Sequence, residues 1–224
     1  MAPRIKTRER IVQSSLELFN AQGERTVTTN HIAAHLGISP GNLYYHFANK
    51  QAIVAELFGR YEARVDQFLR LPPARPMQVE DKALYLEALL GAMWDYRFLH
   101  RDLEGLLDAD AELAQRYAGF AARCLQHARA IYQGFVEAGI LEMDGEQTEA
   151  LALNAWIVLT SWIRFLATAG AGAGQLDPVQ MRRGIYQVLA LESGFVATGA
   201  REAVAALQRQ YFVALDALLP TTDA

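Results

Sequence analysis

The sequence predicts an all-α protein of about ten helices, in which an N-terminal three-helix head is joined by a long helix to a larger helical body. Apolar residues recur at helical spacing along nearly the whole chain. The chain has no window that alternates apolar and polar residues with the β-branched enrichment typical of strands. Short polar residues, glycines and prolines divide it into helix-sized segments. These three observations argue against a sheet-based fold.

Each predicted helix is bounded by residues that start or stop helices. Thr28 or Thr29 and Ser39 are typical N-caps of the second and third helices. Pro40 suits the first position of the third helix, where its missing N–H costs nothing. The prolines within 71–76 mark the clearest break in the chain. The ten predicted helices cover approximately residues 5–22, 29–36, 40–47, 49–69, 79–94, 99–107, 110–139, 147–169, 178–198 and 204–218.

The composition predicts a soluble, cytoplasmic protein with a sizeable core. Of 224 residues, 52% are hydrophobic and 21% are charged, which excludes a disordered chain. A single cysteine, Cys124, excludes a disulfide framework within the chain. The longest charge-free apolar stretch in the middle, 150–163, is shorter than the roughly 18 residues of a membrane span, and the basic N-terminus has no signal-peptide core. Residues 1–60 carry a net charge of +3 and the rest −7, a modest sign that the head meets a polyanion.

The most informative stretch is 28–50, which has the spacing of a helix-turn-helix with a glycine in its turn. Within its second helix, Leu43 and Phe47 share one face and are expected to pack inward. Two exposed tyrosines on so short a helix are costly unless a partner covers them. A helix of this width fits the DNA major groove. The residues expected on the outward face and its flanks are Gly41, Asn42, Tyr44 and Tyr45.

This stretch resembles the signature of the tetracycline-repressor (TetR) family of transcriptional regulators, over about residues 5–57. The matching residues, in order, are Thr28, Thr29, Ile32, Ala33, Gly37, Ile38, Ser39, Gly41, Leu43, Tyr44, His46, Phe47 and Lys50. The resemblance implies an all-α homodimer that binds a palindromic double-stranded DNA operator and is released by a small-molecule effector. It also implies a division into a DNA-binding domain, 1–50, and an effector-binding and dimerisation domain, 51–224.

The resemblance assigns DNA contacts residue by residue, to Thr28, Thr29, Ser39, Pro40, Gly41, Asn42, Tyr44, Tyr45, His46 and Lys50. Thr28 or Thr29, at the N-terminus of the second helix, would contact a phosphate. Tyr44 and His46 would contact phosphates or sugars beside the groove, and Lys50 would pair with a phosphate. Those expected to approach base edges are Ser39, Gly41, Asn42 and Tyr45. A basic arm of Arg4, Lys6 and Arg8 is expected to reach the minor groove. Taken singly, each has a plainer reading, as a helix cap, a solvated charge or partly buried packing; the ordered set favours DNA.

The body matches the family in helix count and length only. Its aromatic content points to a hydrophobic or aromatic effector, with no cofactor implied. Residues expected to line the effector site are Trp94, Phe98, Phe120, Cys124, His127, Trp156, Thr160 and Arg164. Apolar residues at seam spacing on the two long helices near the C-terminus are expected to form the dimer interface, with packing inside one protomer as the alternative. They are Leu151, Ala155, Val158, Trp162, Met181, Ile185 and Val188.

Other constellations carry less weight. His31 and His35 have zinc-compatible helical spacing but lack a nearby third ligand, so no metal site is expected. Gly170, Gly172 and Gly174 follow no predicted strand and are expected to form a loop. Catalytic signatures such as G-x-S-x-G or H-E-x-x-H are absent from the sequence, which argues against an enzyme. An architectural DNA-binding protein remains a competing hypothesis, and it would show little sequence preference.

Overall fold

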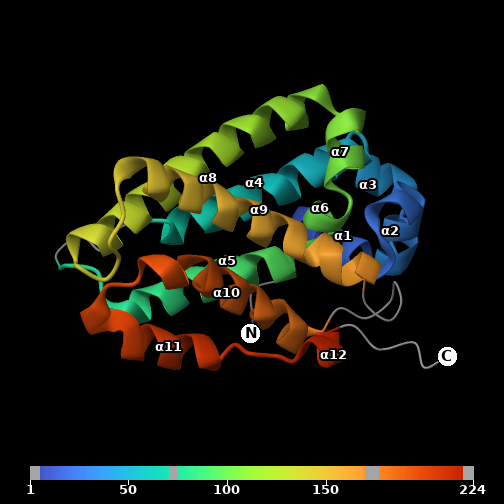
Figure 1. Cartoon of the computed structure of the whole chain (residues 1–224). Helices are drawn as coiled ribbons and strands as arrows, with labels where there is room; N and C mark the ends of the chain where they lie inside the picture. The colour runs from blue at the N-terminus through green and yellow to red at the C-terminus, as the bar shows by residue number, and fades with distance from the viewer. Residues whose placement is uncertain (1–5, 71–74, 170–176, 219–224) are drawn as a thin grey trace, which may run out of the picture. The chain divides into compact units, whose positions relative to one another are not determined.

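The computed structural model describes residues 6–70, 75–169 and 177–218, and within these ranges the chain forms twelve α-helices (Figure 1). Their bounds are α1 Thr7–Gln22, α2 Thr29–Leu36, α3 Pro40–His46, α4 Lys50–Phe68, α5 Val79–Asp95, α6 Arg97–Arg101, α7 Leu103–Ala109, α8 Ala111–Glu137, α9 Gly145–Ala169, α10 Pro178–Glu192, α11 Arg201–Arg209 and α12 Leu215–Leu218. The all-α prediction is confirmed. Ten of the twelve have seven or more residues, which agrees with the predicted number of about ten helices. Parts of the predicted break at 71–76 and the whole glycine loop at 170–174 lie outside the described residues.

Three predicted helices differ from the observed ones. The helix expected at 204–218 is two helices, α11 and α12, separated by residues 210–214. The helix expected at 99–107 is two helices, α6 and α7, because Asp102 leaves helical geometry at φ −111° and ψ 14°. The helix expected at 178–198 ends at Glu192. Beyond it, the Phe195 carbonyl accepts from the Glu142 N–H at 2.8 Å, and the Ala197 N–H donates to the Ile140 carbonyl at 3.0 Å. These backbone bonds to 140–142 replace the bonds that a longer helix would make.

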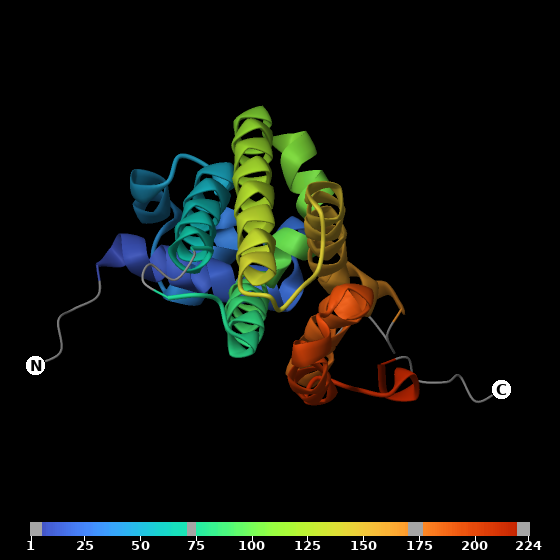
Figure 2. The ribbon, with the colours of Figure 1, turned by 60° about the vertical axis from the view of Figure 1, so that its left-hand side comes forward.

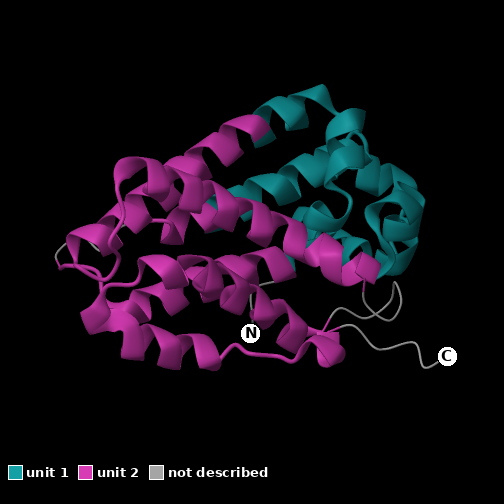
Figure 3. Ribbon diagram, viewed as in Figure 1, with its two compact units in different colours: residues 1–64, 95–117 teal, residues 65–94, 118–224 magenta. Residues whose placement is uncertain are grey.

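The chain divides into two compact units (Figure 3). Unit 1 contains residues 1–64 and 95–117, and unit 2 contains residues 65–94 and 118–224. Unit 1 is therefore larger than the DNA-binding domain expected at 1–50. It includes the first part of α4, together with α6, α7 and the first turns of α8.

Unit 1 is built around an apolar core to which α1, α2 and α3 contribute the fully buried Phe19, Ile32 and Leu43. Asn20 fastens α6 to the end of α1. Its side-chain amide donates to the Asp95 carbonyl at 2.7 Å, and its oxygen accepts from the Phe98 N–H at 3.1 Å. The Phe98 ring then packs on that of Phe19, with centroids 5.2 Å apart. These contacts explain why residues 95–117 belong to unit 1.

Unit 2 is organised by the packing of α9 on α10. Gly184 of α10 lets α9 and α10 approach closely. A Cβ at this position would lie only 3.0 Å from Cδ1 of Trp162 in α9. The Trp162 indole N–H donates to the Gln180 carbonyl at 3.1 Å. Figures 1 and 2 both show α11 alongside α10.

A buried ion pair also joins helices within unit 2. Lys82 of α5 pairs with Glu192 at the end of α10, and both side chains are almost completely buried. The Tyr132 hydroxyl of α8 donates to the same carboxylate at 3.0 Å, while the Lys82 ammonium lies 4.0 Å from the centroid of the Phe135 ring. A buried charge needs such compensation, because desolvation otherwise exceeds the attraction of the pair.

In the described ranges α9 is the one helix long and apolar enough, by length and composition alone, to cross a membrane. Eight of its residues are buried, and much of the buried side packs on α10. Core helices of folded proteins commonly meet the same criterion. The opposite side leaves Leu153 and Ile157 exposed, so the feature to explain is an uncovered apolar face.

Candidate nucleic-acid interface

The helix-turn-helix is positioned by caps at both helix starts. Thr28 caps α2: its hydroxyl accepts from the His31 N–H at 3.2 Å, and the His31 ring nitrogen Nδ1 accepts from the Thr28 N–H. The sequence did not reveal this reciprocal capping box, because histidine replaces the usual glutamate or glutamine. Gly37 ends α2 in the left-handed region at φ 65°, where glycine is unstrained. Ser39 caps α3 by accepting from the Asn42 N–H at 3.2 Å.

The α3 side chains divide between core and solvent as the sequence predicts. Leu43 and Phe47 are buried in unit 1. Tyr45 is 83% exposed and Tyr44 is 49% exposed. Ser39, Pro40, Gly41 and Asn42 are exposed as well. The outward face of α3 therefore presents backbone, an amide and two phenols to solvent.

Gly41 has no structural reason to be glycine within the described residues. Its φ is not positive, and an added Cβ would meet only the Ser39 hydroxyl, at 4.0 Å. Glycine in a helix costs roughly 0.5–1 kcal/mol relative to alanine. The chain thus carries a small stability cost at a position where the backbone stays open to an approaching partner.

The remaining α3 side chains are oriented by their neighbours. The Tyr44 and Thr29 hydroxyl oxygens lie 2.9 Å apart and share a hydrogen bond. The Tyr45 ring meets His46 edge-on, with centroids 5.1 Å apart, and His46 is half-buried. Tyr44 and Thr29 therefore present one hydroxyl cluster at the N-terminus of α2, where backbone N–H groups favour an anion.

Lys50, the first residue of α4, has a partner inside the head. Its ammonium lies 2.8 Å from a carboxylate oxygen of Glu24 and donates to the Glu24 carbonyl at 2.9 Å. Asn49 caps the same helix by accepting from the Ala52 N–H at 2.8 Å. Lys50 thus has two polar contacts with Glu24 inside the head.

The three residues of the predicted basic arm have different positions in the structure. Arg4 lies outside the described residues, and Lys6 immediately precedes α1. Arg8 belongs to α1 and pairs with Glu56 of α4 at 2.8 Å, while its guanidinium lies 4.8 Å from the centroid of the Phe47 ring. Arg8 is therefore engaged in holding α1 to α4.

A second ion pair, Arg60 with Glu9 at 2.6 Å, supports the same helix contact. Hydrogen bonds from Arg60 and Arg8 lower the pKa values of Glu9 and Glu56 respectively. Both carboxylates are therefore ionised at neutral pH. They neutralise two of the cations that the head would otherwise offer to a polyanion.

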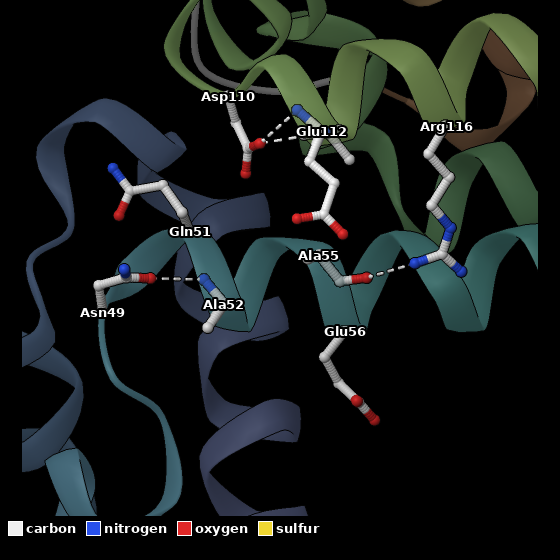
Figure 4. A pocket seen from close by; sticks show the side chains of 9 residues that line it. Asn49, Gln51, Ala52, Ala55, Glu56, Asp110, Glu112 and Arg116 are labelled. Atoms are coloured by element: carbon white, nitrogen blue, oxygen red, sulfur yellow. Dashed lines mark hydrogen bonds between the residues drawn. The ribbon is translucent and has the colours of Figure 1, made fainter.

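Unit 1 also contains a polar cleft of about 500 Å³ between the start of α4 and the start of α8 (Figure 4). Asp110 caps α8 by accepting from the Glu112 and Leu113 N–H groups at 3.0 Å. Arg116 closes the other end. It pairs with Glu62 at 2.7 Å and lies against Gly59. Much of the polar lining thus serves the fold.

The residues expected to line an effector site are divided between the two units. Phe98 lies in unit 1, and the other seven lie in unit 2. Among the latter, the Phe120 and Trp156 rings have centroids 6.4 Å apart, and the Thr160 hydroxyl donates to the Trp156 carbonyl at 2.7 Å. Cys124 is buried, His127 is half-buried, and Arg164 is exposed. The effector role stays a prediction.

The dimer seam expected on α9 and α10 is mostly internal to the protomer. Six of its seven members are buried: Leu151, Ala155, Trp162, Met181, Ile185 and Val188. Beside them lies an apolar groove of about 480 Å³ whose lining includes Ile157, Phe165 and Leu191, all exposed. Val158 and Trp162 contribute to it from the predicted set. The predicted residues therefore lie mainly on the face of α9 that meets α10, and the uncovered face is formed largely by other residues.

The described part of the chain holds no group of three or more His, Cys, Asp or Glu residues placed to bind a metal ion. His31 is used in the α2 cap. His100 is buried in α6, where its Nε2 lies 3.1 Å from the Tyr61 hydroxyl. Burial lowers the pKa of His100 to about 4, so this imidazole is neutral at physiological pH.

Comparison with known proteins agrees with this geometry. Residues 11–57 match the family described as "Bacterial regulatory proteins, tetR family", and residues 60–204 match the TetR family described as "Bacterial transcriptional repressor". The chain therefore belongs to the TetR family, whose members are DNA-binding transcriptional regulators and not enzymes.

Three similar proteins illustrate the relationship. A TetR-family transcriptional regulator of known structure from Marinobacter aquaeolei VT8 is 48% identical with a TM-score of 0.87, over 93% of this chain and 100% of that one. The HTH-type transcriptional regulator TcmR of Streptomyces glaucescens is 26% identical over 124 residues, which span 55% of this chain and 54% of TcmR. The class C tetracycline repressor protein of Escherichia coli is 40% identical over 50 residues, 22% of this chain and 23% of that protein.

Proposed function

We propose that this regulator is a repressor that binds a palindromic operator as a homodimer and is released by a small-molecule effector. The observation that carries the proposal is the exposed face of α3. Gly41 leaves its backbone open, and Tyr45 projects almost wholly into solvent. If no partner bound this surface, replacing Gly41 by alanine would stabilise the protein, and replacing Tyr45 by a polar residue would cost little stability.

Each protomer would read one half-site through α3. Asn42, Tyr45 and the backbone at Gly41 would approach base edges in the major groove, with Ser39 and Pro40 at the start of the helix. Thr29 and Tyr44 would bind one phosphate through their shared hydroxyl pair, assisted by Thr28 at the same helix terminus. His46 and Lys50 would contact phosphates on the flanks. We assign these roles to the DNA-binding domain 1–50, and effector binding and dimerisation to 51–224.

Dimerisation would cover the uncovered apolar face of α9 and α10. Ile157, Phe165 and Leu191 are exposed along it, and Val158 and Trp162 contribute to the groove between them. A second copy presents the same strip, so a two-fold axis would pair the strips with each other. Two heads related in this way would meet half-sites one helical turn of DNA apart, or a multiple of it.

The effector would bind in the body, where aromatic side chains gather. The Phe120–Trp156 contact, with the Thr160 hydroxyl beside it, offers the mainly apolar surroundings with few polar groups that suit a hydrophobic or aromatic ligand. Release requires that the effector prefer the DNA-free conformation, and a coupling of about 1–3 kcal/mol weakens operator binding about 5–150-fold. A protein that binds an operator in this way would act in the cytoplasm.

The proposal is tested by offering the protein a random duplex library and sequencing what it retains. A repressor of this kind enriches one palindromic site, bound as a dimer and preferred over unrelated duplex by about 10³-fold or more. Retention of unrelated sequences with equal affinity would instead identify an architectural DNA-binding protein. A small-molecule library screened for release of the selected duplex then tests the effector.

A further inference from the structure

Lys50, which would bind a DNA phosphate, is paired with Glu24 inside the head. Both side chains are largely withdrawn from solvent, with 24% of Lys50 and 12% of Glu24 exposed. The ammonium meets Glu24 twice, through the carboxylate at 2.8 Å and the backbone carbonyl at 2.9 Å. A lysine ammonium has three N–H donors, so this double contact leaves one donor for a phosphate.

Glu24 lies at a junction within the head. It begins the short 3-10 turn Glu24–Thr26 between α1 and α2, directly after Gly23, whose φ is 90°. Four residues later, Thr28 caps α2. The contact therefore ties the first residue of α4 to the turn that leads into α2. The contact thus links two surfaces that would touch the duplex backbone.

We propose that Glu24 is a positioning and specificity-determining residue for DNA binding. It holds the Lys50 ammonium at the place where one phosphate of a correctly docked site lies, and its negative charge lowers the attraction of this region for phosphates in general. The inference rests on the proposed DNA contact of Lys50.

The physical basis is a difference between specific and non-specific complexes. Non-specific affinity depends almost entirely on neutralising phosphates, so a carboxylate beside the cation subtracts directly from it. In the specific complex, base contacts fix the register, and a pre-oriented donor meets its phosphate with little loss of side-chain entropy. Glu24 would thus lower the affinity for all DNA, but it would lower the affinity for the correct site less than the affinity for other sequences.

The test is Glu24→Gln, which keeps the shape and the backbone carbonyl but removes the charge. Affinity for random duplex should rise about fivefold per head, the effect of one unit charge at contact distance in water. The slope of log affinity against log salt should steepen by up to about 0.9 per head, the value for one more phosphate neutralised. The ratio of specific to non-specific affinity should fall.

Glu17→Gln is the matched control. Glu17 lies on the exposed side of α1, where its carboxylate accepts from the Gln13 amide at 2.8 Å. The substitution removes the same charge from the same domain but leaves Lys50 paired, so it should change non-specific affinity less than twofold. A Glu24→Gln variant that behaves like Glu17→Gln, or that binds random duplex more weakly, overturns the proposal.

A double-mutant cycle separates the part of the effect that passes through Lys50. With Lys50→Gln as background, Glu24 has no ammonium to hold, so the further change Glu24→Gln should alter the ratio of specific to non-specific affinity no more than the Glu17→Gln control does. An undiminished fall of that ratio in this background would show that Glu24 acts independently of Lys50 and contradict the inference. Failure of the proposed function itself looks different, because the unaltered protein would then select no duplex.

Discussion

The helix pairs α2–α3 and α9–α10 use opposite means to stay together and leave opposite surfaces uncovered. The first pair is short and depends on its ends, with caps at Thr28 and Ser39 and a left-handed turn at Gly37. The second pair is long and depends on its middle, where Gly184 admits the Trp162 ring. The first leaves phenols, an amide and open backbone in solvent, whereas the second leaves an apolar strip.

This difference indicates what each surface is built to meet. Hydrogen-bonding groups on a rigid two-helix frame suit a duplex, whose groove edges and phosphates demand exact placement. An apolar strip suits a second copy of the chain, because its gain comes from area buried and not from individual hydrogen bonds. The following predictions test whether the two surfaces are in fact separate in function.

The largest effect is expected from Ile157→Glu on the α9–α10 strip. Ile157 is 52% exposed, so a glutamate there is tolerated by the protomer but is buried and unpaired in a dimer. Sedimentation should show a monomer, and operator affinity should fall at least about 100-fold, because two linked heads bind far more tightly than one.

Leu84→Glu is the control for that variant, since Leu84 of α5 is also exposed in unit 2, at 61%. It should leave both the dimer and operator affinity intact. A dimeric Ile157→Glu protein would show that the strip is not the interface.

The stability of unit 1 should depend on pH through His100, whereas that of unit 2 should depend on it less. Its folded pKa of about 4 lies below the ordinary value of 6.5, so between these values the unfolded state binds more protons than the folded state. The free energy of unfolding should therefore fall as pH falls from 6.5 to 4, by up to about 3 kcal/mol. Glu9 and Glu56, with lowered pKa values, lose their contributions only below their ordinary value of 4.5.

Urea unfolding measures this slope, and amide exchange locates it. Protection should weaken first in α6, which carries His100, and in α4, whose Tyr61 contacts it, and later in α9 and α10. The control His35→Asn changes an exposed imidazole and should keep the slope. Equal loss of protection in both units, or no slope in this pH window, would contradict the prediction.

The smallest effect is expected from Gly41→Ala, which should move stability and binding in opposite directions. Alanine fits the open space in α3 and should raise the free energy of unfolding by up to about 1 kcal/mol, an upper value because Gly41 lies in the first turn of the helix. Operator affinity should nevertheless fall, because the methyl group would occupy the path of the duplex. Gly91→Ala in α5, also with open space around it, should give the gain without the loss. Tighter operator binding by Gly41→Ala would refute close approach at this position.

The head could be predicted nearly residue by residue because its information is local. Caps, a proline at the first helical position, and a glycine in the turn act over three or four residues, so Ser39, Pro40 and Gly37 could be placed from spacing alone. The exceptions needed partners distant in sequence. Arg8 was expected in an arm but pairs with Glu56, and the partner of Lys50 is Glu24, 26 residues away.

The helices of the body could be predicted from the sequence, but the face that each helix packs against its neighbours could not. On a helix as apolar as α9, period alone does not distinguish the side that packs on α10 from the side that remains open. The sequence therefore favoured Leu151 and Ala155, which are buried, over Ile157 and Phe165, which are exposed. The buried pair of Lys82 and Glu192 lies 110 residues apart and had no local signal at all.

The central claim, that the exposed face of α3 reads DNA bases, is tested most directly by comparing the sites selected by the unaltered protein and by Tyr45→Ala. Tyr45 is so exposed that the variant should unfold at the same temperature. We expect a palindromic site for the unaltered protein and, for the variant, the same half-site spacing with preference lost at one or two base pairs. An identical selected site for both proteins would contradict this claim.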